Sequence, residues 1–231
     1  MKKNWNVRQT SAAIITLIGT TCLLSGCYKA NKPVVAEKSP SEVIYDRGLD
    51  LYLHEKYKEA LEDFNRVLTL DPKNEYAYLG RGNVWARFGN YKQAINEYNE
   101  ALKINPSYAS AYNNRGNVRN YCGDFKGAMQ DFNRALELNP NLPYVYCDRG
   151  ALRSALGDNK GAIDDYNEAI RQDPQYAGAY LNRACSRAVL GDETGAVIDY
   201  EKARQLDPKK IPLFKDPIRE LRKGGEHKFS K

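Results

Sequence analysis

Apolar positions along residues 41–210 form two stripes at helical spacing with a short break between them, and this pattern occurs five times. Such stripes are typical of two amphipathic helices that pack against each other. The clearest marker of the period is a proline that recurs every 34 residues after an Asp or Asn. These prolines are Pro72, Pro106, Pro140, Pro174 and Pro208. Counting back gives five units, residues 41–74, 75–108, 109–142, 143–176 and 177–210.

Within each unit, certain positions always carry one kind of side chain. The eighth position is small, as Gly48, Gly82, Gly116, Gly150 and Ala184. The twentieth is alanine throughout, and the twenty-fourth is aromatic, as Phe64, Tyr98, Phe132, Tyr166 and Tyr200. Small residues let two helix backbones approach closely, and an aromatic ring fills the space that remains. The columns therefore predict a tightly packed helix pair in every unit.

The break between the stripes also has a local explanation. In units two to five it is Gly89-Asn90, Gly123-Asp124, Gly157-Asp158 and Gly191-Asp192. Glycine takes the left-handed conformation that ends a helix, and Asn or Asp caps the next one. The first unit has Glu55-Lys56 instead, and terminal repeats are often atypical. The Asp/Asn-Pro pair then stops the second helix, so the sequence predicts an all-α chain of helix-turn-helix units.

These columns resemble the tetratricopeptide repeat (TPR) in spacing and residue type, without insertion or deletion over 170 of 231 residues. The resemblance implies an α-solenoid of five repeats that forms a right-handed superhelix. It also implies a concave groove, lined by the first helix of each repeat, in which partner proteins or peptides bind.

The N-terminal residues 1–26 are expected to be a signal peptide that is removed. Lys2, Lys3 and Arg8 precede an apolar run that is too short to cross a bilayer, which needs about 20 residues. The run ends in Leu24-Ser25-Gly26-Cys27, which resembles the bacterial lipobox. The resemblance implies a lipid on Cys27 and cleavage before it. The alternatives are an ordinary signal peptide with an incidental cysteine, or an uncleaved anchor.

Both ends of the array carry short extra segments. Residues 27–40 contain two prolines and no helical periodicity, so we expect a tether between the lipidated cysteine and the repeats. In residues 211–231 we expect a short capping helix, between Phe214 and Lys223, and then a disordered basic tail.

Charge argues against nucleic acid as a partner. The formal charge of the whole chain is +6, but the segment 209–231 has eight basic and three acidic residues. Without that tail and the leader, residues 28–208 have 24 basic and 26 acidic residues and are close to neutral. Nucleic-acid binding depends on neutralising many phosphates, so no nucleic-acid partner is expected.

Two further columns, one of arginines and one of acidic residues, recur in every unit, and we call them the ladder. The seventh position is Arg47, Arg81, Arg115, Arg149 and Arg183, and the twenty-third is Asp63, Glu97, Asp131, Asp165 and Asp199. An arginine column suggests an anion-binding stripe. The preferred interpretation is a structural ion pair between the two helices, because guanidinium and carboxylate groups pair in bidentate geometry.

The groove positions that the resemblance implies are rich in asparagine. An amide offers both a donor and an acceptor, so it can pair with the backbone of an extended peptide. The candidate binding residues are Asn83, Asn113, Asn114, Asn117 and Asn182, with apolar contact from Tyr76, Tyr121 and Tyr144. The alternative is a solvated helix face on which asparagine is merely tolerated.

Signals for chemistry are weak. His54 and His227 have no other metal-ligating residues at a usable spacing, so no metal and no cofactor are expected. Apart from the leader and Cys27, three cysteines remain: Cys122, Cys147 and Cys185. Cys147 and Cys185 fall on the groove side of adjacent repeats, where packing is the preferred role and oxidation in an exported protein the alternative.

We therefore expect a non-catalytic adaptor that is anchored by the Cys27 lipid and binds an unknown protein or peptide. Tyr28 follows the lipidated cysteine where enteric bacteria use Asp for inner-membrane retention, so we expect the periplasmic face of the outer membrane. Two alternatives stay open. One is a structural protein that assembles into homo-oligomers, and the other is a thiol-dependent envelope enzyme.

Overall fold

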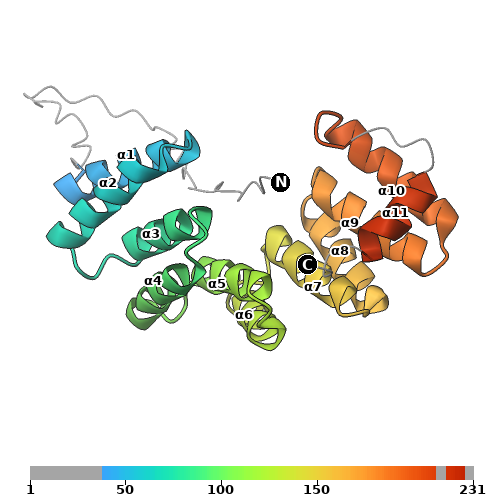
Figure 1. Cartoon of the computed structure of the whole chain (residues 1–231), viewed down its shortest axis with the longest axis horizontal. Helices are drawn as coiled ribbons and strands as arrows, with labels where there is room; N and C mark the ends of the chain where they lie inside the picture. Colours follow the sequence, from blue (N-terminus) through green and yellow to red (C-terminus); the bar gives the residue numbers. More distant parts are fainter. Residues whose placement is uncertain (1–37, 212–216, 227–231) are drawn as a thin grey trace, which may run out of the picture. The chain divides into compact units, whose positions relative to one another are not determined.

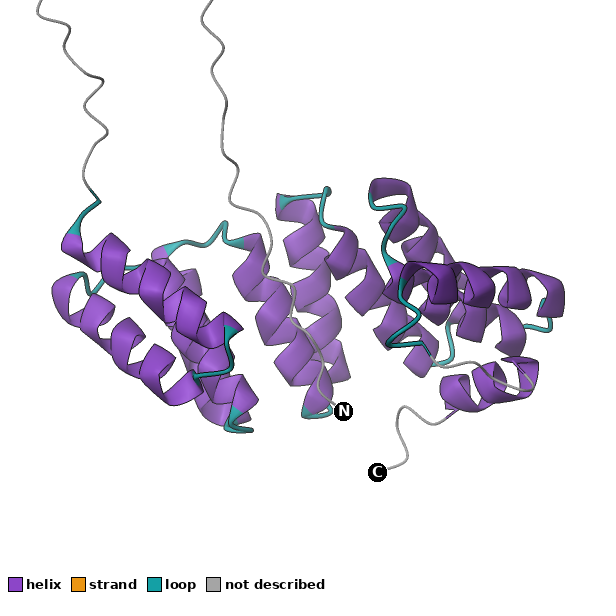
Figure 2. Ribbon diagram, turned by 90° about the horizontal axis from the view of Figure 1, so that it is seen from above, coloured by secondary structure: helices purple, strands orange, loops and turns teal. Residues whose placement is uncertain are grey.

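A computed structural model describes residues 38–211 and 217–226. This part of the chain contains eleven helices and no strand (Figures 1 and 2). The helices are α1 (Pro40–Leu53), α2 (Tyr57–Leu70), α3 (Glu75–Arg87), α4 (Tyr91–Ile104), α5 (Ala109–Tyr121), α6 (Phe125–Leu138), α7 (Pro143–Ala155), α8 (Asn159–Gln172), α9 (Ala177–Val189), α10 (Glu193–Leu206) and α11 (Pro217–Glu226). Helices α1 to α10 fall two to each 34-residue unit and pack in consecutive pairs, so the predicted all-α solenoid is confirmed.

The breaks within the repeats have the predicted geometry. Gly89, Gly123, Gly157 and Gly191 all have positive φ, between 78° and 89°. The next residue caps the following helix: Asp124, for example, accepts a hydrogen bond from the backbone N–H of Gly127. In the first repeat Glu55 takes the same left-handed conformation with φ 60°, and the N-cap Lys56 makes no side-chain capping hydrogen bond. The first break therefore has the same left-handed backbone conformation as the other breaks, although its residues differ from theirs.

Helix α1 begins one residue before the first predicted unit. Ser39 is its N-cap and forms a capping box with Glu42, and Pro40 occupies the first turn. Because a proline needs no backbone N–H at that place, it favours the start of a helix. Ser39 and Pro40 therefore belong to the array and not to the tether, and residues 27–37 lie outside the described residues.

The core of each repeat is built on the small and aromatic columns. A Cβ atom added at Gly82 would lie 2.5 Å from Cε1 of Tyr98, so the ring of α4 rests directly on the backbone of α3. Tyr98, Phe132, Tyr166 and Tyr200 are at most 1 % exposed. Burial of these rings supplies a large share of the apolar area that joins the paired helices.

The odd-numbered and even-numbered helices play different parts in the stack. Each odd-numbered helix from α1 to α9 contacts the next odd-numbered helix, whereas no two even-numbered helices of the described chain are in contact. Figure 1 shows the same arrangement, with α3, α5 and α7 adjacent along one side of the array and α4 and α6 on the other. One face is therefore lined by the first helices of the repeats.

Helix α11 covers the last repeat. It contacts α9 and α10, and its Leu221 is 1 % exposed in a cluster with Ala188 and Tyr200. The helix begins later than expected, at Pro217, and it includes Gly224 and Gly225, which were expected in the tail. Residues 227–231 lie outside the described residues. None of the helices in the described ranges is long and apolar enough to cross a membrane.

Candidate functional site

The arginine column pairs with the acidic column inside every repeat. In repeat three, Arg115 donates from Nε to Oδ2 of Asp131 at 3.0 Å and from Nη2 to Oδ1 at 2.7 Å. Repeats one, four and five have the same bidentate pair, and in repeat two Arg81 binds Oε2 of Glu97. The acidic side chains are only 3–5 % exposed. The ladder therefore lies between the two helices of a repeat, as a structural ion pair would.

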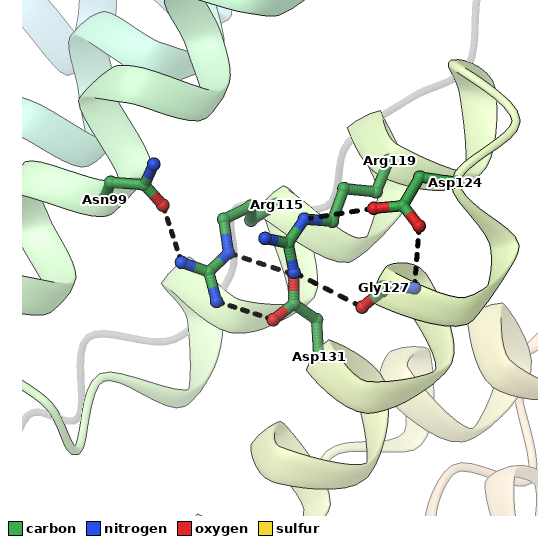
Figure 3. Close-up of polar contacts among 6 residues, drawn as sticks. All are labelled: Asn99, Arg115, Arg119, Asp124, Gly127 and Asp131. Carbon is green, nitrogen blue, oxygen red and sulfur yellow. Dashed lines mark hydrogen bonds and ion pairs between the residues drawn. The ribbon is translucent and has the colours of Figure 1, made fainter.

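A second arginine column, which was not predicted from the sequence, supports the same carboxylates. Arg119 donates to Oδ2 of Asp131 at 2.8 Å and to the backbone oxygen of Gly127, and its Nε lies 3.6 Å from Asp124 (Figure 3). Repeats four and five repeat this contact, with Arg153 beside Asp165 and Arg187 beside Asp199. The 34-residue spacing of these three arginines was the signal that could have revealed them.

The first arginine column also links neighbouring repeats. Arg115 donates from Nη1 to Oδ1 of Asn99 at 2.6 Å, and Asn99 belongs to the preceding repeat (Figure 3). The same link joins Arg81 to Asn65, Arg149 to Asn133 and Arg183 to Asn167. One guanidinium group thus fixes both the helix pair and the stacking of the next repeat. These donors are engaged within the protein, which argues against the anion-binding interpretation of the column.

Most of the candidate groove residues lie where the odd-numbered helices meet. We call this surface the odd-helix face and define it by Tyr76, Asn83, Asn114, Asn117, Tyr144, Asp148 and Asn182. Its asparagines form hydrogen bonds with residues of neighbouring repeats. Asn114 donates to Oδ1 of Asn83 at 2.9 Å, and the Tyr98 hydroxyl donates to the same oxygen.

Three further asparagines make contacts of the same kind. Asn113 and Asn117 on α5 donate to Oδ2 of Asp148 on α7, at 3.2 and 2.6 Å. Asn182 on α9 donates to Sγ of Cys147 at 3.4 Å. Asn113 is 2 % exposed, so its side chain lies beneath the surface and not on it. The asparagines therefore also hold successive repeats together, a role that was not expected from the sequence.

The three candidate tyrosines differ in setting. Tyr76 is 48 % exposed, and its ring centroid lies 6.2 Å from that of Tyr45 and 5.4 Å from that of Tyr108. Tyr144 is half-buried with its hydroxyl 3.3 Å from Ser110, and burial raises its pKa. Tyr121 is 72 % exposed at the end of α5 and packs against Tyr91 of α4. It lies beside the break of repeat three and outside the odd-helix face.

A family model for the TPR repeat matches residues 48–87, 88–119 and 152–185, and a second TPR model matches residues 109–142. Together these ranges cover more than half of the chain. The chain is a tetratricopeptide-repeat protein.

Solved TPR structures share this fold. PilW, a widely conserved type IV pilus biogenesis factor, is 20% identical with a TM-score of 0.70, over 80% of this chain and 87% of that one. TTC0263, a thermophilic TPR protein of Thermus thermophilus, is 19% identical with a TM-score of 0.64, over 80% and 97%. YrrB, a TPR protein with an unusual peptide-binding site, is 23% identical with a TM-score of 0.57, over 78% and 90%. A comparison with curated protein sequences found no match.

The cysteines of this TPR protein occupy three different environments. Cys147 is buried, Cys185 is half-buried and Cys122 is exposed, and none of the three forms a disulfide. Burial and the nearby Asp124 raise the pKa of the Cys122 thiol, which lowers the fraction of reactive thiolate. In the described ranges, no group of three or more His, Cys, Asp or Glu side chains could hold a metal ion. Cys27 lies outside the described residues.

Proposed function

We propose that this protein is a lipid-anchored adaptor that binds an extended segment of a partner protein along the odd-helix face. The observation that carries the proposal is the exposed ring of Tyr76 at the start of a row of neutral amide groups that extends from α3 to α9. Aromatic rings and amides are the groups that recognise a peptide without regard to most of its side chains. Membership of the TPR family and the peptide-binding site named for YrrB support a protein or peptide partner.

The proposed adaptor function requires no catalytic residues in this chain. TPR proteins are in general non-catalytic, and the ladder arginines and carboxylates hold the fold. Binding therefore rests on a rigid surface that the ion-pair ladder keeps in register.

Photo-crosslinking in native envelopes tests where the partner binds. A photoreactive phenylalanine analogue replaces Tyr76 on α3 in the full chain. The matched control places the same analogue at Asn96, which is exposed on α4 of the same repeat. We expect a discrete cross-linked product from position 76 and none from position 96. Products of equal yield from both positions, or a product from position 96 alone, would refute binding on the odd-helix face.

The anchor is a separate part of the proposal: Cys27 carries the lipid, and the protein lies on the periplasmic face of the outer membrane. Metabolic labelling with a radioactive fatty acid is expected to label the wild-type chain and not Cys27→Ser. Membrane fractionation should recover the labelled protein with the outer membrane. A labelled Cys27→Ser chain would contradict lipidation at this residue, and recovery with the inner membrane would contradict the location.

A further inference from the structure

Helix α11 does not take the place that the first helix of a sixth repeat would occupy. It contacts α9 and α10, as such a helix would, but it also contacts α7. In the described ranges, no first helix of a repeat contacts the first helix that lies two repeats away. Helix α11 therefore leans across α9 toward α7, on the side where the odd-numbered helices meet, and Figure 1 shows it beside α9.

The residues that pack with α11 include members of the columns that form the odd-helix face. Leu221 of α11 is 1 % exposed, and Leu181 and Cys185 of α9 pack against the same apolar cluster. Cys185 occupies in repeat five the position that Asn83 and Asn117 occupy in repeats two and three. Both of those asparagines define the odd-helix face. The C-terminal helix of the chain thus covers the α9 end of the surface that we assign to the partner.

The attachment of α11 is weaker than that of the helices in the repeats. Of its described side chains, from Pro217 to Leu221, only Leu221 is buried. Two of its ten residues are Gly224 and Gly225, and glycine is a poor helix former. A helix of this length is not stable alone in water, so α11 depends on its contact with α9. Each repeat, in contrast, has a buried aromatic ring and an ion pair of the ladder.

We propose that α11 is an autoinhibitory segment: it occupies the α9 end of the odd-helix face, and a partner segment displaces it in order to bind along the whole face. This inference rests on the proposed function and adds how access to the binding surface is controlled. Local opening of a weakly attached element leaves the rest of a protein folded. Because only molecules with α11 released offer the whole face, the apparent affinity for the partner is lowered by the fraction that is open.

Thiol labelling of the full chain in detergent tests whether α11 covers α9. A maleimide reagent labels the cysteines, and mass spectrometry of proteolytic peptides gives a rate for each one. Cys185 is half-buried near α11, whereas Cys122 is exposed at the break of repeat three. Leu221→Ala removes the buried contact of α11, so it should accelerate labelling of Cys185 by roughly 10-fold or more and leave the rate of Cys122 unchanged.

A matched variant and urea show whether α11 opens by itself. Leu156→Ala makes the same change at a leucine that is 54 % exposed at the end of α7, and it should leave the rate of Cys185 unchanged. In the wild type, low urea should accelerate Cys185 only slightly, because release of α11 exposes far less surface than global unfolding does. A Cys185 rate that does not respond to Leu221→Ala overturns the inference. A urea dependence as steep as that of global unfolding, followed by circular dichroism, also overturns it.

Photo-crosslinking then separates autoinhibition from the proposed function. With the photoreactive analogue at Tyr76, Leu221→Ala should give more of the cross-linked product in native envelopes than the chain with Leu221. An equal yield overturns autoinhibition and leaves the adaptor proposal standing. If neither chain gives a product, the adaptor proposal fails and autoinhibition fails with it, whatever the thiol labelling shows about the opening of α11.

Discussion

Nη1 of Arg119 lies 2.8 Å from Oδ2 of Asp131, a carboxylate that Arg115 already holds through two hydrogen bonds. Two guanidinium groups thus share one carboxylate whose side chain is 4 % exposed. The first repeat has no such second arginine: Asp63 pairs with Arg47, whose side chain is 54 % exposed, and Arg66 lies 3.7 Å away. The ladder is therefore more deeply embedded in the inner repeats than at the N-terminal end.

This difference predicts unequal costs for the same substitution. Asp131→Asn leaves two half-buried guanidinium groups without their counter-charge and should cost about 3–5 kcal/mol of unfolding free energy. Asp63→Asn should cost clearly less, because Arg47 remains solvated. Urea unfolding followed by circular dichroism measures both. Equal losses would show that the second arginine adds nothing to the ladder.

The break of the first repeat can be improved. Glu55 has φ 60°, a conformation that glycine adopts without strain, so Glu55→Gly should stabilise the protein by about 1 kcal/mol. Lys56→Asp should add about 1 kcal/mol by supplying the missing N-cap. Thermal unfolding measures the gain, and Gly123→Ala serves as the control that should lower stability. A fall in the melting temperature with Glu55→Gly would contradict the argument.

The link from Arg149 to Asn133 predicts an effect on coupling between repeats. Its two atoms, Nη1 and Oδ1, are 2.8 Å apart and belong to repeats four and three. Asn133→Ala should remove about 1 kcal/mol, mainly from the interface between these repeats. The denaturant transition should then become broader as well as earlier. Asn96→Ala, at an exposed position of α4, should leave the transition unchanged; if it broadens equally, the link is not responsible.

The tyrosines predict loss of stability in alkali. Burial, with a hydrogen bond to Tyr121, raises the pKa of Tyr91 to about 12 from its usual 10.0. Burial also raises the pKa of Tyr98 and Tyr166. Because these groups release protons more readily in the unfolded chain, unfolding becomes easier as pH rises above about 10. The free energy of unfolding should be constant with respect to these groups below that pH and fall steadily from about pH 10 through 12.

Tyrosinate absorbance recorded with the unfolding curves tests this dependence. Tyr166→Phe keeps the ring and removes the ionisable group, so its stability should fall less steeply in alkali than that of the wild type. Parallel curves for the two proteins would show that Tyr166 does not contribute.

For much of the candidate site, the sequence predicted which residues lie on the groove side but not which residues they contact. The groove asparagines do lie where the odd-numbered helices meet, but the sequence did not show that Asn114 donates to Asn83 or that Asn117 donates to Asp148. These partners are 31 residues apart and belong to different repeats. A repeat period says which residues recur and does not say how far one repeat is rotated against the next. Side-chain contacts across that interface depend on the rotation.

Local sequence was sufficient to specify the helices, their breaks and their pairing. Those features depend on chemistry that repeats every 34 residues: apolar spacing, glycine with positive φ, a capping Asp or Asn, and proline after the second helix. The hydrogen bonds between polar side chains of neighbouring repeats, in contrast, were decided only by the folded array. The pair of Arg115 with Asp131 was expected from the sequence, but the bond to Asn99 was not: stacking of the repeats brings Oδ1 of Asn99 within 2.6 Å of Nη1 of Arg115. Hydrogen bonds form over such short distances, so the partners between neighbouring repeats are decided by how the repeats pack and not by the sequence pattern alone.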